Sequence, residues 1–417
     1  MASKKHPKMK ILLINKFLYY KGGDAVCTIE TGNLLRSHGH QVFFWGMHHP
    51  ENPEYPNADL FVDNLDLNRS SGIKEQLIVA GKLLYSLESK KKVSALIEKI
   101  GRPDIVHLHN FAHQISPSIL HVLKKNGIPV VMTMHDYKLV CAPYTLLSHG
   151  KVCERCKNGR FINCLKQKCV KNSKIKSFLN TLEMYLHHHV LKIYDLIDVY
   201  ISPSAFLKEK TTEMGFKNKI VHIPNFVKTD IYTPAYDWTE KSIYYLGRLS
   251  PEKGIHTLVE AVKGLNITLK IIGDGPSRQT IEHKINDEKI SNIQLLGYMH
   301  DDRLRNEMSK SMFMVIPSEW YENNPMSVIE SFALGKPVVG ARIGGIPELV
   351  KENKTGLTYE PGNIPDLSAK INDMLSDKNR IKFFGQNARA YVEKELSAET
   401  HYERLMETYT FAIKNYR

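Results

Sequence analysis

Two glutamates, Glu322 and Glu330, stand eight positions apart in a segment whose layout suits a phosphate flanked by hydroxyls. Residues 313–316 form an apolar run typical of a buried strand, and Asn324-Pro325 is a good N-cap and first-turn pair for a helix after it. The carboxylates would flank the N-terminus of that helix, where backbone N–H groups and the helix dipole favour a phosphate. A nucleotide sugar has this layout of sugar, diphosphate and ribose. The alternative is that Glu322 is a surface charge and that Glu330 pairs with a nearby lysine.

Two cations, Arg248 and Lys253, directly follow a strand that we expect at 242–246. They would therefore lie on a strand-to-helix loop at the carboxyl end of a sheet. Such a pair suits a diphosphate leaving group, because the diphosphate gains negative charge as its bond to a sugar breaks.

A pair of glycines, Gly22 and Gly23, lies between the first expected strand and the helix after it. Because glycines lack a side chain, they let backbone N–H groups approach an anion closely. The spacing is not the G-x-G-x-x-G of a dinucleotide fingerprint, which argues against a dehydrogenase.

Short apolar runs alternate with helical patterns along the chain, which predicts the doubly wound α/β class with parallel sheets covered on both faces. The polar, proline-bounded stretch 224–234 divides the chain into domains of residues 1–224 and 225–396, followed by one helix over 397–417. Because doubly wound sheets bind ligands at the carboxyl ends of their strands, a shared substrate would lie in the cleft between the domains. The expected strands are 10–14, 41–45, 104–108, 129–133, 198–201, 219–223, 242–246, 267–272, 293–296, 313–316 and 337–340.

The positive charge of the chain is concentrated in its first half. The 417 residues carry a net charge of +13, with +14 in residues 1–224 and −1 in residues 225–417. This asymmetry indicates an anionic partner for the first domain: lipid head groups, a phosphorylated substrate or nucleic acid. No apolar run reaches the ~20 residues that cross a bilayer, and the run at 11–14 is too short for a signal peptide. We therefore expect a cytoplasmic protein, with the inner face of the cell membrane as a peripheral binding surface.

With these motifs in this order, the sequence resembles the retaining nucleotide-sugar glycosyltransferases of family 4, which have the GT-B architecture of two Rossmann-like domains facing a central cleft. The segments that carry the resemblance are Gly22-Gly23, Gly247-Arg-Leu-Ser-Pro-Glu-Lys-Gly254, Gly273-Asp-Gly-Pro276, Glu322-x7-Glu330 and Gly344-Gly-Ile-Pro-Glu348. The resemblance runs over nearly the whole chain. It implies that the first domain holds the acceptor, that the second holds the donor, and that the C-terminal helix returns to the first domain.

The resemblance also implies a role for each candidate residue. Arg248 and Lys253 would hold the donor diphosphate, while Glu330 would bind the ribose and Glu322 the donor-sugar hydroxyls. Gly23 would approach the phosphate from the first domain. The remaining substrate-binding residues are expected to be Gly22, Asp136, Gly247, Gly273, Asn323, Asn324, Pro325, Met326, Gly297 and Met299, the last two near the nucleotide base.

His135 follows the expected strand at 129–133 and would face the same cleft. The family places a histidine there beside the donor sugar, so the resemblance assigns His135 to the reaction centre. A histidine in a cleft could be a general base, but retaining enzymes of this type are not thought to need one. In the usual proposal the acceptor attacks on the leaving-group face and the departing phosphate takes its proton. The alternative is a structural histidine whose hydrogen bonds are satisfied.

Five of the six cysteines are clustered just after this histidine. They are Cys153, Cys156, Cys164 and Cys169, spaced C-x2-C-x7-C-x4-C, with Cys141 upstream. A C-x2-C knuckle with a second pair nearby is typical of a structural zinc site, and the nine Lys and Arg against one Glu in residues 151–176 favour thiolates. We predict that this insertion, about residues 141–170, binds zinc and braces a loop over the acceptor side, and that catalysis needs no cofactor. The choice of four ligands among five cysteines stays open, and the alternative is free thiols packed in a loop.

These features predict transfer of a sugar from a UDP- or GDP-sugar to a glycan or polyprenyl-diphosphate-linked acceptor in cell-envelope polysaccharide synthesis. One alternative is a GT-B epimerase or phosphorylase, which the glutamate pair and the two cations fit less well. Another is a basic, zinc-containing nucleic-acid-binding protein; the sequence has no RNP-like aromatic motif or recognition helix, so we expect no nucleic-acid partner. Lys90–Lys92, the basic cysteine loop and the helix from Lys171 could form a patch that contacts anionic lipid.

Overall fold

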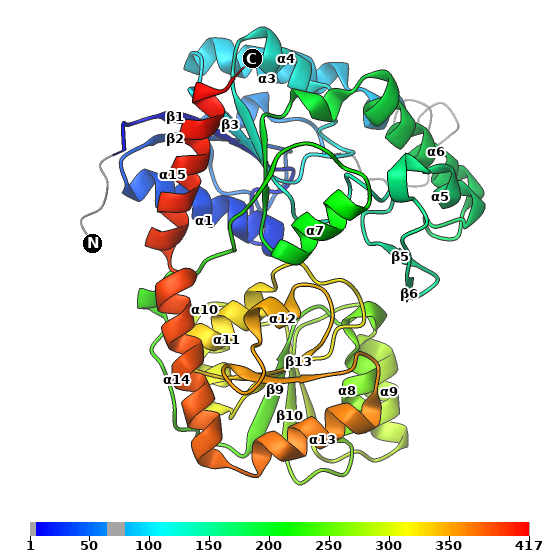
Figure 1. Cartoon of the computed structure of the whole chain (residues 1–417), viewed down its shortest axis with the longest axis vertical. Coiled ribbons are helices and arrows are strands. Elements are labelled where there is room, and N and C mark those ends of the chain that lie inside the picture. Colours follow the sequence, from blue (N-terminus) through cyan, green and yellow to red (C-terminus); the bar gives the residue numbers. More distant parts are fainter. Residues whose placement is uncertain (1–5, 65–79, 417) are drawn as a thin grey trace.

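The computed structural model describes residues 6–64 and 80–416, which form two lobes, each built on one six-stranded sheet (Figure 1). Neighbouring strands are parallel in both sheets. The strands are short and almost continuously buried, which is the pattern of a parallel sheet covered on both faces. The doubly wound α/β class predicted from the sequence is therefore confirmed.

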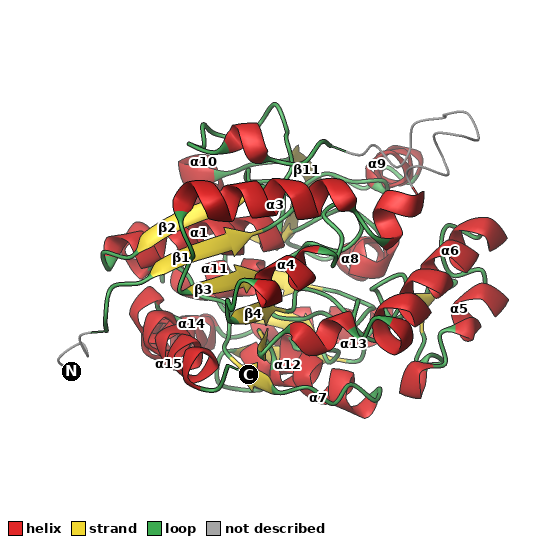
Figure 2. Cartoon of the chain, turned by 90° about the horizontal axis from the view of Figure 1, so that it is seen from above, coloured by secondary structure: helices red, strands yellow, loops and turns green. Residues whose placement is uncertain are grey.

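The first sheet has the strand order β2-β1-β3-β4-β7-β8. Its strands are β1 (Lys10–Ile14), β2 (Gln41–Trp45), β3 (Ile105–Leu108), β4 (Val130–Thr133), β7 (Val199–Ser202) and β8 (Ile220–His222). Helix α1 (Gly23–Ser37) lies on one side of this sheet; α3 (Leu87–Ile100) and α4 (Ile119–Lys125), which contact each other, lie on the other (Figure 1, Figure 2). Helix α7 (Ala205–Glu213) connects β7 to β8.

The cysteine-bearing insertion lies between β4 and β7 at the side of the first lobe (Figure 1). It contains a two-stranded antiparallel ribbon, β5 (Leu147–Ser148) and β6 (Lys151–Val152). Two helices follow, α5 (Ile162–Lys166) and α6 (Lys174–Tyr185), and they pack on each other. The ribbon points toward the second lobe.

The second sheet has the order β11-β10-β9-β12-β13-β14. Its strands are β9 (Ser242–Leu246), β10 (Thr268–Ile272), β11 (Ile293–Gly297), β12 (Met314–Ile316), β13 (Val338–Ala341) and β14 (Gly356–Tyr359). Its helices are α8 (Ile255–Val262), α9 (Arg278–Asp287), α10 (Asp301–Lys310), α11 (Met326–Ala333), α12 (Ile346–Leu349), α13 (Ile364–Leu375) and α14 (Lys378–Glu395). Helix α8 packs against α13, and α11 packs against α14.

The last helix, α15 (Ala398–Lys414), returns to the first lobe, where it continues the line of α14 (Figure 1). Tyr402, Leu405 and Tyr409 of α15 are buried in the hydrophobic core of that lobe. The Tyr409 hydroxyl also lies 2.8 Å from Nδ1 of His107 on β3. Among the helices of the described residues, none combines the length and the apolar character that a membrane span needs.

Candidate active site

A cavity of about 440 Å³ lies between the two lobes, at the carboxyl ends of both sheets. Residues that follow β3 and β4 line it from the first lobe, and residues that follow β9 and β12 line it from the second. The cavity brings together ten of the residues predicted from the sequence: Gly23, His135, Asp136, Gly247, Lys253, Glu322, Asn323, Asn324, Pro325 and Met326. Aromatic residues without a role predicted from the sequence also line it, namely Tyr137, Tyr144, Tyr245, Trp320 and Tyr321.

Glu322 and Lys253 form an ion pair in the wall of this cavity. Nζ of Lys253 lies 2.7 Å from Oε1 of Glu322, which also accepts a hydrogen bond from the Ser318 hydroxyl at 2.6 Å. Glu322 is only 5% exposed, and burial by itself would raise the pKa of its carboxyl. The charge of Lys253 and the two hydrogen bonds outweigh burial and hold the pKa of Glu322 below its usual value. Glu322 is therefore a charged acceptor inside the cavity and not an exposed surface charge.

Close contacts at glycines hold the loops that carry this ion pair. Gly344 has a φ of 60°, and a Cβ there would lie 2.5 Å from the backbone N of Glu322. The N–H of Gly345 donates to the carbonyl of Glu322 at 2.8 Å. Gly254 has a φ of 67°, and a Cβ there would lie 1.8 Å from the carbonyl oxygen of Pro317. A side chain at any of these positions would force the loops apart, so the glycines set the geometry of the pair.

Arg248 lies beside the cavity and not in its lining. Its side chain is exposed. Its guanidinium has no hydrogen bond or ion pair with any residue in the described ranges 6–64 and 80–416. The second predicted diphosphate ligand thus lacks an anion partner, whereas Lys253 already has one.

The helix expected after Asn324 is α11, but its start differs from the prediction. Pro325 is the N-cap residue and not the first helical residue, and no side chain caps the helix. The side-chain oxygen of Asn324 instead accepts the backbone N–H of Asn225 at 3.0 Å. The prediction that Asn324 caps this helix is therefore wrong, because the segment between the lobes occupies its acceptor.

Glu330, the fifth residue of α11, differs electrostatically from Glu322. Burial raises the pKa of Glu330 to about 7, and the Tyr232 hydroxyl and the charge of Arg305 oppose this rise only in part. No lysine within the described part of the chain forms an ion pair with it, and it does not line the cavity. A carboxyl group with this pKa can accept a hydrogen bond from a hydroxyl or donate one to it near neutral pH.

Three glycines predicted to bind substrate lie together at the carboxyl ends of β9, β10 and β11, namely Gly247, Gly273 and Gly297. The N–H of Gly273 donates to the carbonyl of Gly297 at 2.8 Å. Gly273 has a φ of 141°, and a Cβ there would lie 1.9 Å from the carbonyl oxygen of Gly247. Met299 is buried close by in sequence, and Gly22 is the N-cap residue of α1. Of these five residues, only Gly247 lines the cavity.

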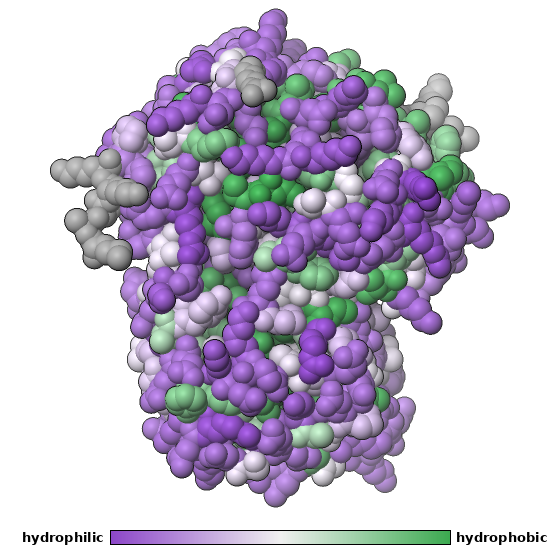
Figure 3. Space-filling model, viewed as in Figure 1, coloured by the Kyte–Doolittle hydropathy of each residue, from purple (hydrophilic) through white to green (hydrophobic). Residues whose placement is uncertain are grey.

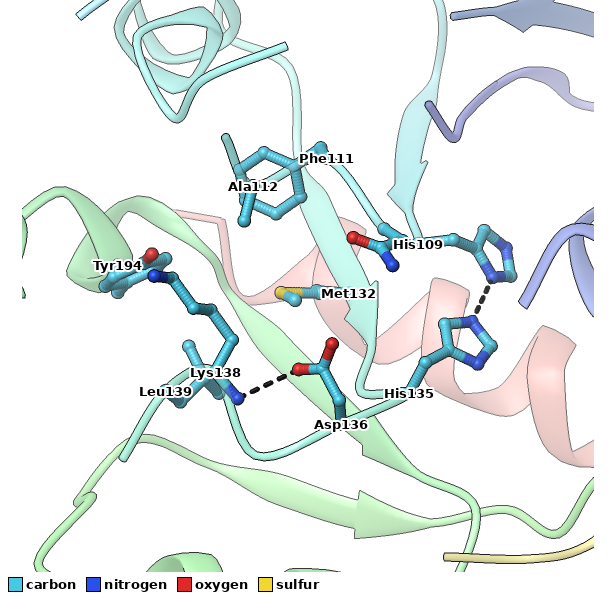
Figure 4. Close-up of a pocket in the computed structure, with 10 residues that line it drawn as sticks. His109, Phe111, Ala112, Met132, His135, Asp136, Lys138, Leu139 and Tyr194 are labelled. Carbon is cyan, nitrogen blue, oxygen red and sulfur yellow. Dashed lines mark hydrogen bonds between the residues drawn. The ribbon is translucent and has the colours of Figure 1, made fainter. Parts of the chain in front are cut away.

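His135 is held by a second histidine, His109, which follows β3. Figure 4 shows the two rings pointing toward one another, and Nε2 of His135 lies 2.9 Å from Nδ1 of His109. Burial lowers the pKa of both imidazoles, so both are neutral near pH 7. The sequence signal for His109 is its position at the end of an expected strand, two residues after His107. That signal alone does not distinguish a site residue from a buried strand residue.

Cys27 of α1 lies next to this histidine pair. Its Sγ and the ring nitrogens of His109 and His135 are within 4.8 Å of one another, the one such group of potential metal ligands in the described part of the chain. Burial raises the pKa of the Cys27 thiol to about 12, and Sγ lies 3.7 Å from the side-chain oxygen of Asn225. A protonated thiol is a poor metal ligand, because metal binding needs a thiolate.

The four predicted zinc ligands lie in the insertion as free thiols. In the described residues, no three of these sulfurs lie within 4.8 Å of one another. A tetrahedral zinc ion with Zn–S bonds of ~2.3 Å needs sulfurs that are closer than this. Zinc binding by Cys153, Cys156, Cys164 and Cys169 therefore stays a prediction that rests on their spacing, and the arrangement of the thiols is not that of a closed site.

The insertion contacts the loop that carries Glu322. Glu154, between Cys153 and Cys156, accepts a hydrogen bond from the Tyr321 hydroxyl at 2.8 Å and lies 2.9 Å from Nζ of Lys210. Because Tyr321 directly precedes Glu322, the insertion braces the second-lobe wall of the cavity.

Asn323 joins the two lobes on the other side of Glu322. Its side-chain amide donates to the carbonyl of Met134 at 3.1 Å, and its side-chain oxygen accepts the Ser204 hydroxyl at 2.8 Å. Asn323 was predicted to bind substrate, but both of its side-chain polar atoms form hydrogen bonds with the first lobe.

Two parallel α/β lobes with a cavity between the carboxyl ends of their sheets define the GT-B fold. Solved structures share it over almost their whole length. Sucrose-phosphate synthase from Thermosynechococcus elongatus aligns with a TM-score of 0.73 at 18% identity, covering 97% of this chain and 99% of that chain. HepE from Anabaena, in complex with UDP and glucose, aligns with a TM-score of 0.65 at 17% identity, covering 96% and 99%.

The chain belongs to glycosyltransferase family 4. Residues 21–231, just over half of the chain, match the family described as Glycosyltransferase Family 4, and residues 233–391 match Glycosyl transferases group 1. An uncharacterised glycosyltransferase of Methanocaldococcus jannaschii is 32% identical over 197 residues, which are 47% of this chain and 55% of that relative. An uncharacterised 42.6 kDa protein in the cps region of Klebsiella pneumoniae is 28% identical over 82% of this chain and 87% of its own length.

Replacing Glu330 with glutamine should change how folding stability depends on pH. Below pH 4.5 the wild-type carboxyl is protonated in the folded and the unfolded chain alike. Between pH 4.5 and about 7 the unfolded chain releases this proton while the folded chain keeps it, so the wild type loses stability as pH rises. The free energy of unfolding is measured in urea for Glu330→Gln and for wild type. The value for the variant minus the value for wild type should be about 1–3 kcal/mol higher at pH 8 than at pH 4.5. A difference that is the same at both pH values would contradict the raised pKa.

Metal analysis tests the cysteine insertion. We expect about one zinc ion per chain in protein purified without chelator. Cys153→Ser with Cys156→Ser should lose the metal, whereas Cys27→Ser, outside the insertion, should keep it. Protein that contains no zinc even after purification in zinc-supplemented medium would end the prediction.

Proposed function

We propose that this chain is a retaining glycosyltransferase that moves a sugar from a UDP- or GDP-linked donor to a glycan or lipid-linked acceptor in cell-envelope polysaccharide synthesis. The observation that carries the proposal is the Lys253–Glu322 ion pair in the cavity, beside the unpaired guanidinium of Arg248. The fold neighbour HepE holds UDP and glucose, and the Klebsiella relative lies in a cps region. A lipopolysaccharide core biosynthesis glycosyltransferase of Rhizobium meliloti is 25% identical over 44% of this chain.

In this mechanism Arg248 and Lys253 bind the donor diphosphate, and Glu322 accepts hydrogen bonds from donor-sugar hydroxyls. The bond between the anomeric carbon and the phosphate oxygen breaks, and the two cations neutralise the charge that the diphosphate gains. The acceptor oxygen bonds to the anomeric carbon on the same face, and its proton passes to the departing phosphate oxygen. No protein nucleophile takes part in this step. His135, neutral near pH 7, positions the donor sugar through a hydrogen bond.

Arg248→Ala is the sharpest test of the donor site, because removal of an unpaired, exposed guanidinium leaves no other group without a partner. The variant should bind UDP or GDP about 10- to 100-fold more weakly, as expected for a lost charge-assisted contact to phosphate, with an unchanged melting temperature.

A thermal-shift screen of UDP-, GDP- and ADP-sugars first identifies the donor, since a ligand that binds only the native state raises the melting temperature.

Arg303→Ala, an exposed arginine of the same lobe outside the cavity, is the matched control and should bind the nucleotide normally. Equal nucleotide affinity of Arg248→Ala and wild type would refute the diphosphate role. Release of nucleotide that depends on an added acceptor separates transfer from epimerase or phosphorylase chemistry.

We also propose that the insertion rests on an anionic membrane surface. Ile175, Phe178 and Leu182 of α6 are 74%, 52% and 41% exposed, and their spacing places them along one side of the helix. Lys174 and Lys176 on the same helix are exposed as well. Figure 3 shows hydrophobic residues among hydrophilic ones at the edge of the first lobe where α6 lies. An apolar row bordered by lysines is the pattern of a helix that lies in the membrane interface.

Sedimentation with vesicles tests this surface. The full chain should bind vesicles containing phosphatidylglycerol and not purely zwitterionic ones. Ile175→Ser with Phe178→Ser should reduce binding about tenfold or more, because two apolar side chains no longer leave water. Phe383→Ser, a 55% exposed aromatic residue of the second lobe, should bind like wild type. Undiminished binding of the double variant would assign the contact to another surface.

A further inference from the structure

A second cavity, of about 250 Å³, opens next to the donor cavity and lies wholly within the first lobe. The two cavities share a polar wall made of Asp24, Asn110, Asp136 and Tyr144. The residues that line only the second cavity are Lys16, Phe17, Lys21, Ala112, His113 and Lys138. All three of its lysines therefore lie on the side that the donor cavity does not reach.

Lys16 is a cation without an anion partner. It follows β1, and its backbone N–H donates to the carbonyl of Asn110 at 2.8 Å. Within residues 6–64 and 80–416, its ammonium has no carboxylate oxygen within 4.0 Å and no hydrogen bond. The ammonium is partly withdrawn from water, and burial lowers the pKa of Lys16 although Asp24 and Asp136 oppose this effect. Such a charge is costly to keep unless a ligand supplies the missing anion.

Lys21 adds a second available cation. Its Nζ lies 3.9 Å from the centre of the Phe17 ring, which also lines the cavity. Among the described residues no carboxylate pairs with it. Lys138 differs, because its Nζ lies 2.8 Å from the buried carboxylate of Glu183. The charge of Lys138 is thus compensated within the protein, whereas the charges of Lys16 and Lys21 are not.

The backbone around the second cavity is strained. His113 has a φ of 68° and Tyr144 a φ of 57°, a left-handed conformation that side-chain-bearing residues rarely adopt. Both residues line the cavity. Strain of this kind persists where the surrounding structure enforces it, and it is concentrated at binding and catalytic sites.

We propose that the second cavity binds an anionic group of the acceptor, a phosphate or a carboxylate, with Lys16 and Lys21 as its ligands. The proposal rests on the proposed glycosyltransferase function. The attacking hydroxyl of the acceptor lies at the shared wall, where Asp24 and Asp136 accept hydrogen bonds and His135 is adjacent in the chain. The anionic group lies on the far side, away from the donor diphosphate. The acceptor is therefore a phosphorylated or acidic sugar or polyol and not a neutral one.

Inorganic pyrophosphate and D-glucuronate are suitable probes, one for each kind of anion. Titration calorimetry uses the full chain carrying Arg248→Gln and Lys253→Gln, which remove the cations of the donor site, together with Glu322→Gln, so that no buried carboxylate is left without its cation. This protein should still bind one of the two probes, and that probe identifies the acceptor anion. Adding Lys16→Met or Lys21→Met should weaken the binding about tenfold or more, which is the loss expected for one charge-assisted contact.

Lys125→Met, an exposed lysine of the same lobe outside both cavities, should leave probe binding unchanged. If neither probe binds, or if Lys16→Met does not alter the affinity, the inference is overturned. UDP or GDP binding by protein with Arg248 and Lys253 intact is measured separately. That measurement alone tests the donor-site proposal, so a failure of the acceptor-site inference can be told apart from a failure of the donor site.

Melting temperatures separate a ligand-binding lysine from a structural one. Because the Lys16 ammonium has no partner, Lys16→Met should keep or raise the melting temperature, and Lys16→Arg should restore probe binding. Lys138→Met should lower the melting temperature, because it leaves the carboxylate of Glu183 buried without its cation. A marked drop in melting temperature for Lys16→Met would show a structural role and would overturn the inference.

Discussion

A buried carboxylate needs a cation, and this requirement organises the second-lobe wall of the cavity. Glu322 stays ionised inside the cavity because Lys253 reaches it from a different loop. Leaving such a charge without its partner costs on the order of 3–5 kcal/mol, so the ion pair between Lys253 and Glu322 holds the two loops together. The glycine contacts at Gly254 and Gly344 are what allow the loops to approach closely enough for the pair to form.

The residues on either side of Glu322 extend this constraint across the molecule. Tyr321 reaches Glu154 in the insertion, Asn323 reaches the first lobe, and Asn324 reaches the segment between the lobes. One short loop therefore carries Glu322, the proposed ligand of the donor sugar, together with contacts to the first lobe and to the segment between the lobes. A change in the separation of the lobes would move Glu322 relative to any bound sugar.

Most strands and both charged motifs could be predicted from sequence, because buried parallel strands are continuous apolar runs and loops after them are polar. Strand β14 was missed, since Gly-Leu-Thr-Tyr at 356–359 alternates small and polar residues with apolar ones. The role of Asn324 was predicted wrongly, because a capping preference is local while its partner Asn225 is 99 residues away. The roles of His109 and Lys16 depend likewise on groups from other strands and loops. Local chemistry could be predicted, whereas pairing between distant segments could not.

Helix α15 has a consequence for how the chain is made. Five of its residues belong to the core of the first lobe, namely Tyr402, Leu405, Met406, Tyr409 and Ala412, and the other buried members of that core come from the first 226 residues. The buried core of the second lobe comes from one continuous segment, residues 227–396. During synthesis on the ribosome, the first lobe emerges first but cannot complete its core until α15 has emerged. The second lobe can complete its core before α15 is made.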